Sequence, residues 1–199
     1  MRHGQTPWNR DGRFRGRSEL GLDERGFKQA QAVAKHIASY PVSAIYSSPL
    51  RRAIETAEAI AQALGLTVEP VDGLTDIDFG QWQGLSPDEL SEEHRELYRR
   101  WLASPHLVRP PQGESLEEVS SRALKAVKQI AERHENETVV TVSHEGVGRV
   151  ILCTLLGADL SQFRRIQQDL ASISIFEMRD GGAVVTRINE LCHLKGIDG

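Results

Sequence analysis

The stretch ETVVTVSHEGVGRVIL, residues 137–152, contains the pattern that decides the fold. It begins with a run of valines and threonines, the β-branched residues that favour a strand. A polar turn containing His144 follows, and the residues from Gly146 to Leu156 are largely apolar, as in a buried helix. The stretch therefore predicts a buried strand that leads through His144 directly into a helix.

Strands and helices alternate on both sides of this stretch. Further strands are predicted at 43–48, 67–71, 172–178 and 183–189, the last two flanking the turn RDGG at 179–182. Helices are predicted at 23–40, 50–64, 86–103, 115–134, 146–156 and 161–168. This order predicts an α/β fold, a three-layer α/β/α sandwich with a mostly parallel central sheet. No repeat, low-complexity tract or linker is visible, so residues 1–199 are predicted to form a single domain.

Two of the predicted helices carry additional local signals. The helix at 23–40 has an apolar stripe formed by Phe27, Ala30, Val33, Ala34 and Ile37. The helix at 115–134 begins with Ser115 and Glu118, the spacing of a capping box. Both signals support the predicted starting points of these helices.

The composition is that of an ordinary globular protein, with 39% hydrophobic and 26% charged residues. The net charge of −4 argues against a basic nucleic-acid-binding surface. No apolar run approaches the roughly 18 residues of a membrane span, and the polar start MRHGQT is unlike a signal peptide. Cys153 and Cys192 show neither CxxC nor metal-ligand spacing, so we expect two buried thiols. These features predict a cytoplasmic protein with no nucleic-acid or membrane partner.

Positive charge is concentrated near one early histidine, His3. The arginines in this stretch are Arg2, Arg10, Arg13, Arg15 and Arg17. Because the chain as a whole is acidic, this local excess favours a small anionic ligand over a polyanion.

Further polar residues follow the predicted strands. Arg52 follows the strand predicted at 43–48, Asp76 follows the one at 67–71, and His144 follows the strand in the stretch 137–152. In open α/β sheets, ligands bind beyond the carboxyl ends of the strands, so these side chains are expected to share a cleft with His3. Arginine binds phosphate oxygens in a bidentate manner, and a neutral imidazole can attack phosphorus. The combination favours phosphoryl transfer.

Five motifs make a family resemblance specific. In chain order they are RHGQTPWN, SSPLRRAIETA, TDIDFGQWQGL, GESLEEV and VSHEGVGRVIL. This series resembles the histidine phosphatase superfamily, also called phosphoglycerate mutase-like, and it extends over essentially the whole chain. RHG alone would be weak support, whereas five motifs in this order are strong support.

The resemblance implies a role for each matching residue. His3 corresponds to the nucleophile that becomes phosphorylated, and His144 to the second histidine that contacts the phosphoryl group. Asp76 falls at the position of the proton donor. The phosphate-binding residues implied by the resemblance are Arg2, Asn9 and Arg52.

The chain also departs from the family pattern. Only Met1 precedes the RHG motif, so the usual central strand is missing or shortened, and we expect the natural start to lie upstream. Asp76 stands where glutamate is usual, Arg15 where glutamine is common and Glu145 where glycine is common. Arg15 and Glu145 are therefore candidate substrate contacts, together with His106 in the segment that tends to cover the cleft in this family.

The short connection between Asp76 and Ser115 is similar to the compact phosphatase branch rather than to the mutases, which carry an insertion there. We predict a metal-independent phosphomonoesterase, a histidine acid-type phosphatase, that hydrolyses small phosphorylated metabolites through a phosphohistidine. No cofactor is expected. Asp76 and Asp78 form a D-x-D pair but lack the preceding apolar strand of a magnesium-dependent aspartyl phosphatase, so no metal is predicted. A phosphoglycerate mutase and a phosphoester-binding protein with little turnover remain alternatives, and a homodimer is left open.

Overall fold

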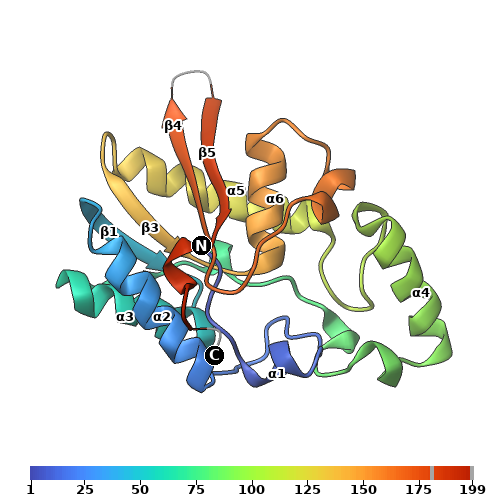
Figure 1. Ribbon diagram of the computed structural model, residues 1–199. Coiled ribbons are helices and arrows are strands. Elements are labelled where there is room, and N and C mark those ends of the chain that lie inside the picture. The colour runs from blue at the N-terminus through green and yellow to red at the C-terminus, as the bar shows by residue number, and fades with distance from the viewer. Residues whose placement is uncertain (180–181, 198–199) are drawn as a thin grey trace.

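The computed structural model describes residues 1–179 and 182–197 (Figure 1). Its α-helices are α1 (Pro7–Arg10), α2 (Glu24–Ile37), α3 (Arg51–Leu64), α4 (Glu92–Ala103), α5 (Leu116–Arg133) and α6 (Glu145–Leu155). Its strands are β1 (Val42–Ser47), β2 (Val68–Pro70), β3 (Thr138–Val142), β4 (Ile173–Arg179) and β5 (Gly182–Glu190). The central sheet is parallel with the order β2-β1-β3, and β4 and β5 form an antiparallel hairpin. The predicted α/β fold with a mostly parallel sheet is confirmed.

Helices cover both faces of the central sheet, with α2 and α3 on one side and α5 and α6 on the other (Figure 1). Neighbouring residues of β1 point to opposite faces, as a strand requires. Ile45 packs with Val33 of α2 and Ile60 of α3, whereas Tyr46 packs with Ile130 of α5. The sheet is therefore the middle of three layers, as the sequence predicts.

Residues 1–3 lie beside the end of β3. Arg2 forms a parallel bridge with Ser143, and the His3 amide donates a hydrogen bond of 3.0 Å to the Ser143 carbonyl. On the other side, the Ala171 amide donates to the His3 carbonyl at 3.0 Å, and the Arg2 amide to the Ser172 carbonyl at 3.2 Å. The RHG motif is thus paired on both sides, at the place where the sequence analysis expected a strand to lead into it.

Two glycines allow the segment after His3 to lie against the start of α2. A Cβ added to Gly26 would lie 2.1 Å from the Gln5 carbonyl oxygen, and one added to Gly4 would lie 2.6 Å from the Gly26 carbonyl oxygen. Both obstacles are backbone atoms, which cannot move aside as a flexible side chain can. The close contact holds the chain on both sides of His3.

The structure corrects several boundaries. The helix predicted at 23–40 ends at Ile37, the one at 86–103 begins at Glu92 after a short 3-10 turn, and the one at 161–168 is a 3-10 helix, η5 (Leu160–Arg165). The capping box of Ser115 and Glu118 is present. Both strands of the hairpin are confirmed, but residues 180–181 of the RDGG turn lie outside the described residues.

Two side chains expected in the core are on the surface. Phe27 was assigned to the apolar stripe of α2, yet 46% of it is exposed, because the neighbouring face of that helix packs on the sheet. Cys192 was expected to be buried and is exposed, whereas Cys153 in α6 is buried. Both cysteines are free thiols. Within residues 1–179 and 182–197, every helix is too short or too polar to span a membrane.

We expect Gly26→Ala to destabilise the protein by about 1–3 kcal/mol although alanine favours helix, because its methyl group would clash with the Gln5 backbone. Gln31→Ala, at an exposed position of the same helix, is the matched control and should change the free energy of unfolding by less than about 0.5 kcal/mol. Urea denaturation measures both values. A Gly26→Ala protein as stable as the control would show that the contact does not constrain the fold.

Candidate active site

His3 is a buried histidine with one free ring nitrogen. Its side chain is 1% exposed, and Nδ1 lies 2.6 Å from the Gly4 carbonyl oxygen, to which it can donate a hydrogen bond. Nε2 is buried and has no hydrogen-bond partner among the described residues. Burial, reinforced by the nearby Arg52 guanidinium, holds the pKa of His3 well below its usual value. The imidazole is therefore neutral at pH 7, with its Nε2 lone pair available.

His144 is the N-cap residue of α6 and lies next to His3. The centroids of the two rings are 5.1 Å apart. His144 Nε2 forms a hydrogen bond of 2.7 Å with the Ser48 hydroxyl, and its Nδ1 lies 3.6 Å from Asp76 Oδ2. Burial is the main cause that holds the pKa of His144 well below its usual value, followed by the charge of Arg52. Two neutral imidazoles therefore stand side by side.

Arg52, in the first turn of α3, brings a buried positive charge to the two histidines. It is 0% exposed, and its terminal nitrogens donate to the Gly16 carbonyl at 2.6 Å and the Ser18 carbonyl at 2.9 Å. It also forms an ion pair of 3.0 Å with Asp76 Oδ2. Burial lowers the pKa of Arg52 from its usual value, but the carboxylate partner opposes this effect. Loop carbonyls and Asp76 thus fix the guanidinium in place.

Arg2 supplies a second buried guanidinium. It donates to the Gln168 carbonyl at 2.6 Å and pairs with Glu145 Oε2 at 2.9 Å. Burial lowers the pKa of Arg2 to about 10, so it stays charged at neutral pH. Glu145 also lies 2.8 Å from Arg149 and 3.9 Å from Arg15. One carboxylate therefore partly neutralises three arginines at the edge of the site.

Asp76 connects the arginine and histidine groups. It is 6% exposed, its Oδ1 accepts a hydrogen bond from the Ile77 amide, and its Oδ2 faces Arg52 and His144. Arg122 of α5 holds the loop from behind, because its guanidinium donates to the carbonyls of Thr75 and Asp76 at 2.6 and 3.0 Å. Asp76 is thus placed by backbone contacts as well as by charge.

Five buried polar atoms of this group lack a hydrogen-bond partner within the described part of the chain. They are Nε of Arg2, Arg15 and Arg52, Nε2 of His3 and Nδ1 of His144. A buried polar atom without a partner is rare, because burying it away from water costs free energy. Three N–H donors gathered around two imidazoles form a site for an anion that accepts several hydrogen bonds, as a phosphate does.

The structure also shows where the other predicted residues lie. Asn9, Arg15 and Glu145 line a pocket of about 490 Å³ together with Arg2, whereas His3, Arg52, Asp76 and His144 do not line it. His106 lies in the 3-10 turn Pro105–Leu107 (η4), with its Nδ1 buried, and does not line this pocket. Arg2 is thus shared between this pocket and the buried group.

Three arginines of the early basic stretch do not belong to the site. Arg10 pairs with its neighbour Asp11, Arg13 with Glu89 at 2.6 Å, and Arg17 with Glu114 at 2.9 Å. The expectation that all this charge surrounds His3 is therefore wrong for these three. Their carboxylate partners neutralise them, whereas Arg2 and Arg15 of the same stretch line the pocket.

Two residues that support the site are not among those predicted from the sequence. Ser48 follows β1 at the same sheet edge as Arg52, so the rule that locates sites at strand ends could have found it. Arg122 lies in the middle of α5, and its spacing gives no indication that it holds the loop of Asp76. Such a contact becomes visible when the helix is packed against the sheet.

Comparison with known proteins identifies relatives over nearly the full length of the chain. A family model described as "Histidine phosphatase superfamily (branch 1)" matches residues 1–191. Phosphoserine phosphatase 1 of Hydrogenobacter thermophilus is 40% identical over 194 residues, which are 98% of this chain and 92% of the relative.

Two solved structures have the same fold. YhfR of Bacillus stearothermophilus superposes with a TM-score of 0.93 at 30% identity, covering 98% of this chain and 96% of that one. A mutant phosphoserine phosphatase of Entamoeba histolytica, in complex with phosphoserine, gives 0.86 at 30% identity, covering 97% and 96%. The fold described above is therefore shared with these proteins.

The buried histidines make stability depend on pH. Since the pKa of His3 is lower in the folded protein than its usual value of about 6.5, the unfolded chain binds more protons below that pH. The free energy of unfolding should therefore fall as pH drops through about 6.5, by up to about 1.4 kcal/mol per pH unit for each such histidine. His3→Asn removes one of these groups and should make the slope shallower. Equal slopes in urea titrations between about pH 7.5 and 5 would contradict this explanation.

Proposed function

The chain belongs to branch 1 of the histidine phosphatase superfamily, and on that basis we propose that it is a metal-independent phosphomonoesterase with a phosphohistidine intermediate on His3. Relatives named phosphoserine phosphatase support a small phosphorylated metabolite as the substrate. The observation that carries the mechanism is the free, buried Nε2 of His3 amid unpaired arginine donors. The two free thiols support the further proposal of a cytoplasmic location.

In the proposed first step, His3 Nε2 attacks the phosphorus atom in line with the ester oxygen. A nitrogen–phosphorus bond forms as the phosphorus–oxygen bond breaks, and the ester oxygen leaves with its electron pair. Nδ1–H of His3 donates a hydrogen bond to the Gly4 carbonyl, so that the Nε2 lone pair is the one directed toward the substrate. Arg2 and Arg52 bind the equatorial oxygens, whose charge must be stabilised in the transition state.

Asp76 is the proposed proton donor to the leaving oxygen. Its Oδ2 faces both Arg52 and His144, so it adjoins the place where a phosphate would bind these residues. In the second step a water molecule attacks the phosphohistidine, and Asp76 accepts a proton from it, as microscopic reversibility requires. The products are the alcohol and inorganic phosphate, and His3 returns to its neutral form.

The contacts of both aspartates support the proposal that no metal takes part. Asp76 directs its oxygens to the Ile77 amide and to Arg52, whereas Asp78 accepts from the Gly80 amide at 2.8 Å and faces Arg17. The two carboxylates thus serve separate partners. Arginines therefore supply the positive charge that a magnesium ion supplies in metal-dependent phosphatases.

Arg15 and Glu145 are proposed to contact the part of the substrate beyond the phosphate. Both line the pocket next to Arg2, so a group attached to the phosphoryl oxygen would meet them. Glu145 now binds Arg2, and an incoming phosphate would compete with it for that guanidinium. Once displaced, the carboxylate is available to a cationic group on the substrate, such as the ammonium of an amino acid.

We expect phosphate release from phosphoserine to continue at an undiminished rate in excess EDTA, because the positive charges of the site belong to the chain itself. His3→Asn should lower turnover by several orders of magnitude in the same assay, since it removes the nucleophile. Loss of wild-type activity in EDTA with recovery in magnesium would disprove the metal-free mechanism. Phosphorylated product formed from glycerate phosphates without phosphate release would instead favour the mutase alternative, and binding without turnover the binding-protein alternative.

Asp76→Asn should slow the hydrolysis of alkyl phosphates by about 10²–10⁴-fold, because an alkoxide leaving group needs a proton. Hydrolysis of nitrophenyl phosphate should suffer much less, since nitrophenolate leaves without one. The substitution also removes the ion pair with Arg52, which should slow the hydrolysis of both substrates equally. The ratio of the two rate losses therefore measures proton donation alone. Asp78→Asn is the matched control. Equal losses on both substrates in single-turnover phosphorylation would show that Asp76 is a positioning residue.

A further inference from the structure

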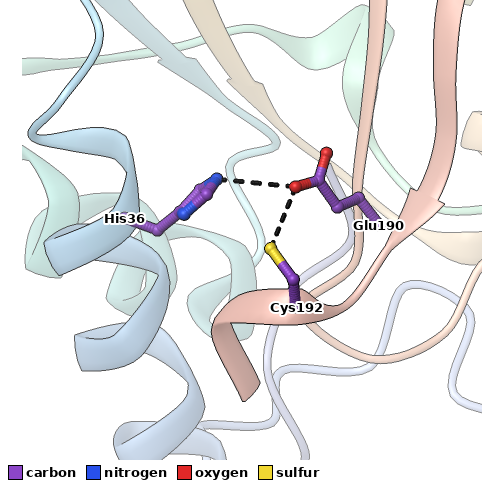
Figure 2. A group of neighbouring side chains, drawn as sticks. All are labelled: His36, Glu190 and Cys192. Carbon is purple, nitrogen blue, oxygen red and sulfur yellow. Dashed lines mark hydrogen bonds and ion pairs between the residues drawn. The ribbon is translucent and has the colours of Figure 1, made fainter. Parts of the chain in front are cut away.

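A second group of chemically reactive side chains lies away from His3, where the end of the hairpin meets α2. His36 lies in the last turn of α2, Glu190 ends β5, and Cys192 begins the 3-10 helix η6 (Cys192–Leu194). Figure 2 shows the three side chains converging, with dashed lines that join the Glu190 carboxylate to both the imidazole and the thiol. The catalytic mechanism proposed above uses none of them.

The donor atoms are close enough to share one ion. Glu190 Oε1 lies 3.8 Å from His36 Nε2 and 3.0 Å from Cys192 Sγ, and all three ligand atoms lie within 4.8 Å of one another. In a tetrahedral zinc site with ordinary bond lengths, pairs of such ligands are about 3.4–3.6 Å apart. The present spacings bracket that range, from 3.0 Å for the carboxylate and thiol to at most 4.8 Å for any pair.

Two of the polar atoms in this group are buried without a hydrogen bond in the described structure, namely His36 Nε2 and Glu190 Oε2. Arg187 Nε approaches Glu190 Oε2 at 3.3 Å, whereas His36 and Cys192 lie near the other oxygen, Oε1. An imidazole nitrogen left unpaired beside a carboxylate and a thiol is a donor set that favours a divalent transition metal.

We propose that His36, Glu190 and Cys192 bind a zinc ion that joins the C-terminal segment to α2. Nitrogen, oxygen and sulfur are all ordinary zinc ligands, and three protein donors leave the fourth tetrahedral position to water. On binding, the Cys192 thiol loses the proton that it now shares with Glu190 and coordinates as thiolate, and the proton passes to solvent. Hard ions such as magnesium would not select this thiol-containing set.

The location suggests a stabilising role. The ring of His193 lies beside that of His36, with centroids 5.4 Å apart, and its Nε2 is 2.9 Å from the Ala171 carbonyl oxygen. The Ala171 amide in turn donates to the His3 carbonyl. A zinc ion bound to Cys192 would therefore help to hold the next residue, His193, against the Ala171 carbonyl. Ala171 in turn pairs with the backbone of His3, the proposed nucleophile. The site stands apart from the phosphatase proposal, because its ligands do not touch the phosphate site.

The test is a titration of the metal-free full-length protein with Co²⁺, followed by its absorption spectrum. Thiolate coordination gives a charge-transfer band in the near ultraviolet, which should saturate at one equivalent. Cys192→Ser and His36→Gln should both lose the band, and Glu190→Gln should weaken binding at least tenfold. Cys153→Ala, which removes the other thiol, is the matched control and should keep it.

A thermal measurement with Zn²⁺ gives a second readout. Zinc at about 100 times its dissociation constant should raise the melting temperature by about 5–10 °C in the wild type and in Cys153→Ala. It should not do so in Cys192→Ser or His36→Gln, whose metal-free melting temperatures should match the wild type. The proposal is overturned if the Co²⁺ band does not form, if it persists in Cys192→Ser or His36→Gln, or if the zinc effect is equal in all four proteins.

Discussion

The arrangement of the whole site depends on the backbone pairing of His3. Its amide binds the Ser143 carbonyl and its carbonyl accepts from the Ala171 amide, so the residue is held between the end of β3 and the segment that leads into β4. Gly4 and Gly26 then let the following residues lie directly on α2. This pairing buries the imidazole, brings it within 5.1 Å of His144 and leaves Nε2 directed away from the Gly4 carbonyl. A shift of His3 would separate the proposed nucleophile from both arginines.

Burial has opposite effects on the groups around His3. Desolvation keeps the two histidines neutral, which the proposed attack requires, and the same burial is costly for the charged Arg2 and Arg52. Asp76 and Glu145 offset this cost in the free protein by pairing with Arg52 and Arg2. A bound phosphate would take over part of that role, since it offers acceptors to the arginine nitrogens that now lack partners. These contacts support the proposal of a ligand that brings negative charge with it.

The sequence predicted the part of the site that follows from strand ends. Arg52, Asp76 and His144 come together because parallel strands end at the same edge, which periodicity and turn residues reveal. The surface ion pairs of Arg13 and Arg17 could not be predicted, because Glu89 and Glu114 approach them only after the loops fold. For the same reason, the contact of Arg122 with the Asp76 loop could not be predicted. Nor could the group of His36, Glu190 and Cys192, whose members come from three elements. Phe27 shows that an apolar stripe in a helix identifies the buried face but does not fix where that face ends, since this residue was assigned to the stripe and is exposed.

The most direct test of the central claim is to trap the covalent intermediate. Protein mixed with radiolabelled phosphoserine and quenched in alkali within a single turnover should carry label that is stable to base and released by acid, as a phosphohistidine is. Peptide mapping should place it on His3, and His3→Asn should carry none although it still binds the substrate. Label on another residue, label retained by His3→Asn, or turnover with no labelled protein at any time would contradict the account.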